Sequence, residues 1–274
     1  MIPATFDYLA PTTVEEALSA LAEHGDEAKV LAGGQSLLPV LRMRLNAPEV
    51  VVDLGRIDSL KGITEDGDTV TIGAMTTYAD VLASDVVKEH LALLHEAVST
   101  VADPQIRHRG TIGGACVHAD PAGDVGPAVL ALDGEFVITG SGGERTVGAA
   151  DFFEDLFETA VGEGELLTGI RFTKHTGWGA AYEKFVRVSH QWSIVAVAAT
   201  VKDGRAKIGL ANMGATPLRA GAAEEAFASG GAEAAGAKAA DGTNPPSDLN
   251  GDADYRRHLA GVLTRRALTK AAGG

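Results

Sequence analysis

Two Gly-Gly pairs with polar neighbours constrain the fold of this chain more than any other feature of its sequence. The first pair, Gly33-Gly34, follows an expected strand at 29–32 and precedes Gln35-Ser36, with which a short helical stretch begins. The second pair, Gly113-Gly114, lies within the stretch 109–115. Glycine permits positive φ angles and close approach to the main chain. Consecutive N–H groups near a helix start can surround an anion, so the two loops together predict a diphosphate site.

One Gly-Gly turn alone is weak support for a ligand site, because such turns also occur for purely structural reasons. Two of them suit a dinucleotide, whose diphosphate is held from both sides while nearby Ser, Thr and Asp side chains bond the sugar groups. Neither loop matches G-x-G-x-x-G or the phosphate-binding loop of ATPases. We therefore expect a dinucleotide site that is neither a Rossmann site nor a P-loop.

The charge and hydropathy of the chain exclude several classes of function. The formal charge of −14 argues against a nucleic-acid partner, since phosphate backbones are bound by clustered Lys and Arg. Hydrophobic residues make up 45% of the 274 residues, but charged residues interrupt every apolar run, so we expect no membrane insertion. The N-terminus has no basic region followed by an apolar stretch, which predicts a cytoplasmic protein without a secretory signal.

Cysteine usage is the most informative count, because Cys116 is the only cysteine. A single cysteine forms neither an internal disulfide nor a structural zinc site nor a Cys-ligated iron–sulfur cluster. Any cluster chemistry must therefore lie on another chain. We expect Cys116 to fill a small buried position.

The sequence pattern divides the chain into three regions. Their bounds are 1–56, 57–177 and 178–274. In the first region, Thr13 and Glu16 form a capping box for a helix that stops at Gly25. Strands are expected at 29–32 and 49–54, which makes this region a small α/β unit.

The middle region mixes short strands with helices and long loops. A strand at 69–73 precedes two helical stretches, 78–83 and 86–101, and irregular Gly-rich chain follows. Further strands are expected at 136–139 and 166–172. This order indicates an α+β arrangement rather than a regular β-α-β series.

The last region combines a small sheet with helices. Strands are expected at 180–186, 194–201 and 205–212, and the turn Asp203-Gly204 makes a hairpin of the last two. A helix at 218–228 follows.

The end of the chain has two parts of different character. The stretch 228–251 is rich in Ala, Gly, Asn and Pro, which predicts a mobile surface linker. A final helix at 255–270 carries the apolar stripe Leu259, Val262, Leu263 and Ala267. Its arginines are Arg256, Arg257, Arg265 and Arg266. We expect these arginines to form a solvated face, with a partner subunit as the alternative.

Four segments of the chain resemble a known family. They are Ala32-Gly33-Gly34-Gln35-Ser36-Leu37-Leu38-Pro39, Ile72-Gly73-Ala74-Met75-Thr76-Thr77, Ile106-Arg107-His108-Arg109-Gly110-Thr111-Ile112-Gly113-Gly114 and Tyr255-Arg256-Arg257-His258-Leu259. In this order they are similar to the FAD-binding medium subunit of the xanthine dehydrogenase and carbon monoxide dehydrogenase family of molybdenum hydroxylases. The similarity covers nearly the whole chain and is greatest to the separate medium chain of bacterial carbon monoxide dehydrogenase-type enzymes.

The resemblance implies a fold and a role. The fold is α+β, of the vanillyl-alcohol oxidase (PCMH) type in the first two regions, plus a C-terminal three-stranded antiparallel sheet with helices. The role is that of the flavin subunit of an oxidoreductase complex, which binds FAD non-covalently, accepts electrons from [2Fe–2S] clusters and passes them to an external acceptor. The alternatives are a self-sufficient FAD-dependent oxidoreductase of the same wider fold and a scaffold that has lost its cofactor.

The resemblance also implies partners. A large subunit is expected to carry molybdenum with a pterin dinucleotide, and a small subunit two [2Fe–2S] clusters, with the whole assembly a dimer of heterotrimers. The substrate of the complex stays open, since its pocket would lie on another chain.

The resemblance assigns cofactor contacts position by position. The diphosphate and its surroundings are assigned to Lys29, Ala32, Gly33, Gly34, Gln35, Ser36, Thr111, Ile112, Gly113, Gly114 and Ala115. Asp124 matches an acidic residue that hydrogen-bonds FAD, and Leu167 and Lys184 match positions near the flavin ring. A positive charge there stabilises the anionic reduced flavin. Trp192 matches an aromatic position, and it either stacks on the ring or belongs to the core.

Three positions depart from the family pattern. Related chains often carry His at the place of Gln35, Asn at that of Ala115 and Asp at that of Gln191. Ala115 offers only its backbone N–H, so a side-chain hydrogen bond is missing there.

No catalytic group or metal ligand is expected in this chain. His108 lies beside the second loop, and a hydrogen-bonding role is favoured there over covalent flavin attachment; His118 and His190 share this ambiguity. Asp120 and Asp124 are spaced like an acid pair. A cofactor-binding or loop-capping role is favoured for them, because no nucleophile or oxyanion hole adjoins.

Overall fold

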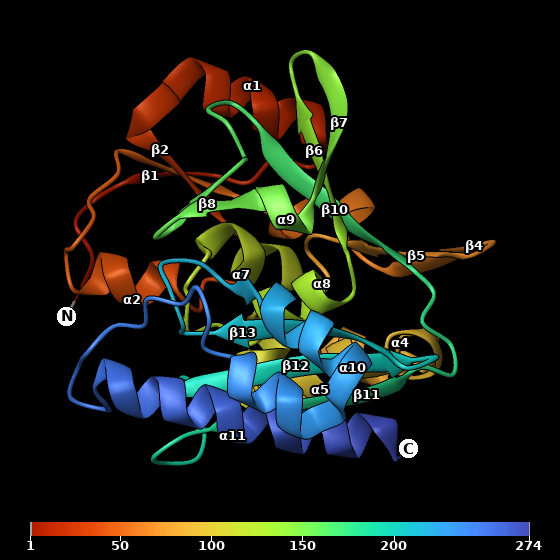
Figure 1. The fold of residues 1–274 in the computed structure, drawn as a ribbon. Coiled ribbons are helices and arrows are strands. Elements are labelled where there is room, and N and C mark those ends of the chain that lie inside the picture. The colour runs from red at the N-terminus through yellow and green to blue at the C-terminus, as the bar shows by residue number, and fades with distance from the viewer. Residues whose placement is uncertain (1, 274) are drawn as a thin grey trace.

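The computed structural model describes residues 2–273, which form a layered α+β molecule (Figure 1). Helix α1 (Val14–His24) lies at the top of the view, and helices α10 (Gly221–Lys238) and α11 (Ala253–Ala272) lie at the bottom, with the C-terminal sheet. The middle region lies mainly between them, and parts of it reach the level of α1 and of the C-terminal sheet. The predicted α+β class is confirmed.

The first region is a parallel sheet with a helix packed against it. The sheet order is β1 (Asp7–Leu9), β3 (Val50–Asp53), β2 (Ala28–Leu31). The Thr13 hydroxyl accepts a hydrogen bond from the N–H of Glu16 at the start of α1, and Gly25 takes a φ of 48° at its end, as predicted. Helix α2 (Leu37–Arg42) follows the first glycine loop. Short 3-10 helices cover Gly25–Glu27, Leu54–Arg56 and Asp58–Leu60.

The middle region is built on a five-stranded antiparallel sheet. Its order is β4 (Ile63–Asp66), β5 (Thr69–Gly73), β10 (Leu166–Thr173), β6 (Glu135–Gly140), β7 (Gly143–Gly148), and a separate hairpin joins β8 (Phe153–Asp155) to β9 (Glu158–Thr159). Its helices are α3 (Tyr78–Ala83), α4 (Asp85–His90), α5 (Ala92–Ser99), α6 (Pro104–Arg109), α7 (Ile112–His118), α8 (Val125–Ala131) and α9 (Ala149–Phe152).

Two expectations for the middle region are wrong. The stretch 86–101 is not one helix, because the backbone leaves helical geometry at Leu91 (φ −132°, ψ 47°), between α4 and α5. The Gly-rich chain after it is not irregular, since it contains α6, α7 and α8. Side chains of Asp103 and Thr111 accept hydrogen bonds at the starts of α6 and α7, and these caps offset the poor helix propensity of glycine.

The C-terminal sheet confirms the three predicted strands. It runs β11 (Gly179–Phe185), β12 (Val195–Lys202), β13 (Arg205–Ala211), with a two-residue fourth strand β14 (Leu218–Arg219) at the edge. Asp203 and Gly204 both have positive φ, as a tight two-residue hairpin requires. Helices α10 and α11 cover one face, and α5 and α8 of the middle region pack against the other. Strand β12 is therefore buried on both faces.

The expected linker at 228–251 is wrong for residues 228–238, which are helical, whereas 239–251 contains no helix. Helix α10 begins at Gly221, not 218, and runs to Lys238 with one non-helical residue, Gly231 (φ 67°). Ala235 and Ala239 are buried in the core that α10, α11 and the C-terminal sheet share. Small residues gave the stretch its linker-like composition, but they also let α10 pack closely on α11.

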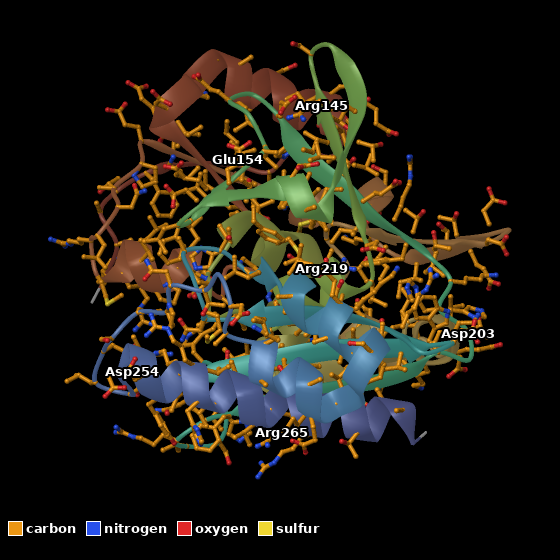
Figure 2. All side chains as sticks on the ribbon, viewed as in Figure 1. Arg145, Glu154, Asp203, Arg219, Asp254 and Arg265 are labelled. Atoms are coloured by element: carbon orange, nitrogen blue, oxygen red, sulfur yellow. The ribbon has the colours of Figure 1, made fainter. Side chains whose placement is uncertain are left out.

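The expectation of a fully solvated arginine face on the last helix is wrong at one position. Arg256 is fully buried; its Nη1 donates to the carbonyl of Ile194, and its Nη2 lies 2.7 Å from Asp248 Oδ1. Arg265 lies on the outer side of α11, as Figure 2 shows.

The middle region and the C-terminal sheet share one core. Tyr182, Ala196 and Ala198 pack with residues of α5 and α8. Arg219, near the centre of Figure 2, donates to the carbonyl of Leu130 at 3.0 Å and pairs with Asp133 at 2.5 Å. The sheet is thereby fixed against the helices that follow the second glycine loop. No helix within residues 2–273 has the length and apolar character needed to cross a bilayer.

Candidate functional site

The two glycine loops lie against each other. A Cβ atom at Gly33 would overlap the carbonyl oxygen of Arg109, and one at Gly114 would come within 3.2 Å of the Ala32 side chain. Only glycine allows the backbones to approach this closely. The structure therefore brings together the two segments that the sequence analysis paired.

The first loop presents a row of backbone N–H groups. Within residues 2–273, the N–H groups of Gly33, Gly34, Gln35 and Ser36 have no acceptor. These residues are half-buried, and Gly34 takes a φ of 75°. Four consecutive backbone donors without a protein acceptor suit the oxygens of an anion such as a diphosphate.

The second loop uses four of its N–H groups within the protein. The bonds are Ile112 to the Thr76 carbonyl (3.0 Å), Gly113 to the Ala74 carbonyl (2.9 Å), Gly114 to Thr111 Oγ1 (3.1 Å) and Ala115 to the Thr111 carbonyl (3.1 Å). The two loops are therefore unequal. The first loop offers donors, and the second loop forms a rigid support behind it. Because the backbone N–H of Ala115 is bonded to Thr111, Ala115 offers no free donor.

Asp124 and Lys184 form a buried ion pair between the middle region and the C-terminal sheet. Lys184 Nζ lies 2.8 Å from Asp124 Oδ2, and the two side chains are 8% and 4% exposed. The hydroxyl of Tyr182, two residues earlier on β11, donates to Asp124 Oδ1 at 2.7 Å. Lys184 also donates to the carbonyl of Thr100 at 3.2 Å. Two of the expected site residues thus meet, and Tyr182 joins them.

The electrostatics of this pair revise one expectation. Burial raises the pKa of the Asp124 carboxyl, while the charge of Lys184 and hydrogen bonds from Lys184 and Tyr182 oppose that rise. Lys184 is not an isolated positive charge, since the carboxylate beside it compensates the ammonium. The expectation of a lone positive charge at Lys184 is therefore revised to one member of an Asp–Lys pair.

Leu167 and Lys29 occupy different surroundings. Leu167 is buried on β10 at a bulge opposite β6. The next residue, Thr168, accepts a hydrogen bond from the N–H of Ala74, whose carbonyl holds Gly113, so β10 adjoins the second loop. Lys29 is exposed on β2, and its ammonium forms no ion pair within residues 2–273. It is a free cation two residues before Leu31, where β2 ends.

Trp192 is not a core residue, because its side chain is 57% exposed. It lies in the connection between β11 and β12, whose base is fixed to the Asp124 loop. Ser193 Oγ donates to the carbonyl of Ala122 at 2.8 Å, and Asn212 Nδ2 donates to the carbonyl of Ser193 at 2.9 Å. The neighbouring carbonyl of Ile194 accepts from Arg256.

Four residues that shape this site were not predicted as site residues from the sequence. They are Tyr182, Ser193, Asn212 and Arg256. For Tyr182 a signal was available, since residues two apart on a strand share one face and Lys184 was already assigned. For the other three, the contacts join segments far apart in the chain, and no spacing predicts them.

Other candidate groups have ordinary structural roles. Asp120 Oδ1 accepts from the N–H of Ala122 at 2.9 Å, which is loop capping. His190 Nδ1 lies 2.7 Å from the Ala102 carbonyl oxygen, and His118 packs on Phe157. Within residues 2–273, His, Cys, Asp and Glu side chains form no group of three suited to a metal ion.

The fold and loops define a class: an α+β nucleotide-binding protein in which two facing glycine loops, without a Rossmann fingerprint, precede a buried Asp–Lys pair. Comparisons with known proteins agree with this class. Residues 4–173 match the family described as FAD binding domain in molybdopterin dehydrogenase, and residues 180–271 match the CO dehydrogenase flavoprotein C-terminal domain.

Relatives of known function match over the full length. The chain is 41% identical to the carbon monoxide dehydrogenase medium chain of Hydrogenophaga pseudoflava, covering 99% of this chain and 98% of that one. It is 35% identical to the glyceraldehyde dehydrogenase medium chain of Sulfolobus acidocaldarius, covering 99% and 100%. The solved carbon monoxide dehydrogenase from Hydrogenophaga pseudoflava has a chain that superposes with a TM-score of 0.96 at 42% identity, covering 100% and 99%.

The chain belongs to the FAD-binding medium subunits of the carbon monoxide dehydrogenase-type molybdenum hydroxylases. These are heteromeric oxidoreductases with large and small partner subunits, and their molybdenum and iron–sulfur centres lie on those other subunits. Membership in this family favours the subunit role over a self-sufficient oxidoreductase.

Proposed function

We propose that the first glycine loop holds the diphosphate of FAD, and that this chain passes electrons from the [2Fe–2S] clusters of the small subunit to an external acceptor. The observation that carries the proposal is the row of four unmatched N–H groups at Gly33, Gly34, Gln35 and Ser36. Bound FAD supplies the redox chemistry, which no side chain of this protein provides.

The residues of the chain divide the work of holding the cofactor. The first loop and Lys29 supply donors and positive charge for the diphosphate, and Ala32 packs against Gly114. Thr111, Ile112, Gly113 and Ala115 keep the supporting loop rigid. Asp124 accepts hydrogen bonds, Lys184 favours its ionised form, Leu167 forms an apolar wall near the ring, and Trp192 limits access to it.

The lone cysteine supports the division of labour between subunits. Cys116 is buried, and one thiol cannot ligate a cluster, so electrons must arrive from a partner chain. The two relatives named above are medium chains of enzymes for carbon monoxide and for glyceraldehyde. We propose that the substrate is likewise chosen on another subunit.

We also propose where FAD lies and how the subunits assemble. We place FAD between the regions 1–56 and 57–177, with 178–274 as a third domain that completes the site. The complex is a dimer of heterotrimers in the cytoplasm. Light scattering of the purified complex tests this stoichiometry, and a mass that corresponds to one heterotrimer would refute it.

A visible spectrum tests the cofactor assignment. The chain is purified with its partner chains through a tag on the chain itself, and we expect flavin absorption together with iron–sulfur absorption. Acid precipitation should release all flavin into the supernatant. If neither the chain nor the complex contains flavin, the proposal is wrong; flavin that stays on the precipitate would show covalent attachment.

Electron flow is tested on the same complex. A dye that accepts electrons from reduced flavin should be reduced by the intact complex and not after reversible removal of FAD. Dye reduction by the chain alone with an organic substrate would instead favour the self-sufficient oxidoreductase.

A further inference from the structure

The carboxylate of Asp124 is turned away from the helix that it precedes. Asp124 lies at the start of α8, but its side chain makes no capping hydrogen bond there. An aspartate in this place ordinarily accepts from the first N–H groups of the helix. Both of its oxygens instead face β11, where Tyr182 and Lys184 donate to them. The neighbouring sheet, not the local chain, sets the orientation of this carboxylate.

Tyr182 is a fixed donor. Its side chain is buried, and its N–H donates to Glu96 Oε2 at 3.0 Å. It pairs with Ala198 in the register of β11 and β12, and it packs in the core that the sheet shares with α5 and α8. Burial and packing of the ring hold the hydroxyl at Asp124.

The two bonds leave part of the carboxylate free. An ionised carboxylate has about four lone-pair sites, of which Tyr182 and Lys184 use one on each oxygen. The remaining lone pairs can accept hydrogen bonds, and the hydroxyl and N–H groups of FAD can donate them. A protonated Asp124 would itself be a donor on one oxygen and would lose this match.

We propose that Tyr182 is a positioning residue of the cofactor site: with Lys184, it holds the ionised Asp124 carboxylate in the orientation that accepts hydrogen bonds from FAD. This inference rests on the proposed function. It assigns to Tyr182 no contact with the cofactor, only an action through Asp124.

The charged and titratable groups around Asp124 predict how FAD binding depends on pH. The titratable groups that face Asp124 are Tyr182 and Lys184 of β11, Asp120 of the preceding loop and Tyr78 of α3. Lys184 is the only cation among them, and Asp120 opposes ionisation. Loss of the Tyr182 hydroxyl removes one hydrogen bond to the charged form, so Asp124 should take up its proton at a higher pH.

The test is FAD rebinding by the complex that carries Tyr182→Phe. FAD is removed from the complex with its partner chains, and rebinding is followed by FAD fluorescence from acidic to alkaline pH. We expect about tenfold weaker binding at neutral pH. The fall in affinity on acidification should begin at a higher pH than in the unmodified complex.

A matched control uses the other Tyr–Asp hydrogen bond. Tyr8 donates to Asp53 Oδ2 at 2.5 Å, but at the exposed surface of β1. Tyr8→Phe should leave both FAD affinity and its pH profile unchanged. Asp124→Asn removes the titrating group, so it should abolish the acid-side fall both alone and combined with Tyr182→Phe.

The possible results test the role of Tyr182 separately from FAD binding by the complex. If Tyr182→Phe binds FAD with unchanged affinity and pH profile, the inference is overturned. An equal loss at every pH also overturns it, since that result reflects packing alone, as does an Asp124→Asn complex that keeps the original pH profile. If the unmodified complex binds no FAD, the proposed function itself fails. Should Tyr182→Phe not assemble, the Asp124→Asn profile decides.

Discussion

Gly236 of α10 and Gly261 of α11 face each other so closely that a Cβ atom on either residue would come within 2.8 Å of the other's carbonyl oxygen. A backbone carbonyl cannot move aside as a flexible side chain does. We expect Gly261→Ala to lower the free energy of unfolding by about 1–3 kcal/mol, because the two helices must separate. Urea denaturation of the purified chain measures this loss.

Gly221 is the matched control for that substitution. It lies at the first position of α10 and has no heavy atom within 4 Å of an added Cβ. Gly221→Ala should be neutral or slightly stabilising, since alanine favours helix. Equal stability of the Gly261 and Gly221 variants would show that the contact between α10 and α11 is looser than described.

Gly33→Ala should release most of the FAD from the complex. The added methyl group would overlap the Arg109 carbonyl and force the two loops apart. The readout is the ratio of flavin absorbance to protein. Gly148→Ala is the control, because this glycine has negative φ and open space around it, and it should retain FAD. Full flavin content in Gly33→Ala would contradict the loop contact.

Arg256→Lys should loosen the connection that carries Trp192. A lysine cannot reach both the Ile194 carbonyl and Asp248, so one of these contacts is lost, at a cost of about 1–2 kcal/mol in unfolding free energy. The chain has two tryptophans, and Trp178→Phe leaves Trp192 as the sole reporter. We expect lower fluorescence anisotropy of Trp192 in the Arg256→Lys variant.

Arg265→Lys provides the comparison for this measurement. Arg265 pairs with Glu233 on the outer side of α11 (Figure 2). Its replacement should change neither the anisotropy of Trp192 nor the unfolding free energy beyond a few tenths of a kcal/mol. The same anisotropy in all three chains would show that Arg256 does not restrain the connection.

Cys116 should be inert in the folded chain. Burial raises the pKa of its thiol far above the ordinary value, so the native state holds this proton when an unfolded chain has lost it. Stability is therefore full below the ordinary thiol pKa and declines as pH rises above it. A thiol reagent should label no cysteine in the native protein and one in denaturant. In the Cys116→Ala variant, the melting temperature should decrease less as the pH becomes alkaline. Rapid native labelling would contradict this.

Local signals in the sequence predicted the elements that form the site. The capping box at Thr13, the strand that ends at Gly33-Gly34 and the hairpin at Asp203-Gly204 each depend on residues close in sequence. They are confirmed because sterics and hydrogen bonds act there over a few residues. The failures have the opposite origin. The small residues of 228–239 look like a linker in isolation, but as far as Lys238 they form a helix that packs on α11.

Predictions for the site likewise succeeded where local sequence decides and failed where distant contacts decide. The paired Gly-Gly motifs predicted that the two glycine loops act together. They did not predict that the N–H groups of residues 112–115 are already bonded, because two of the acceptors, Ala74 and Thr76, lie on a different segment. Nor does any local pattern reveal a buried Arg256, whose partners precede it on other segments. Contacts between distant segments decide which of several plausible polar residues are buried.

The ion pair of Asp124 and Lys184 joins two stretches that a ribosome completes at different times. The first glycine loop, its support and Asp124 emerge before β11 exists, and the carboxylate then has neither of its two donors. A nascent chain that ends near residue 177 thus has both glycine loops but no donors that fix the Asp124 carboxylate. On the proposed function, FAD is held fully only once the C-terminal sheet has folded, so we expect cofactor loading to follow the folding of this sheet.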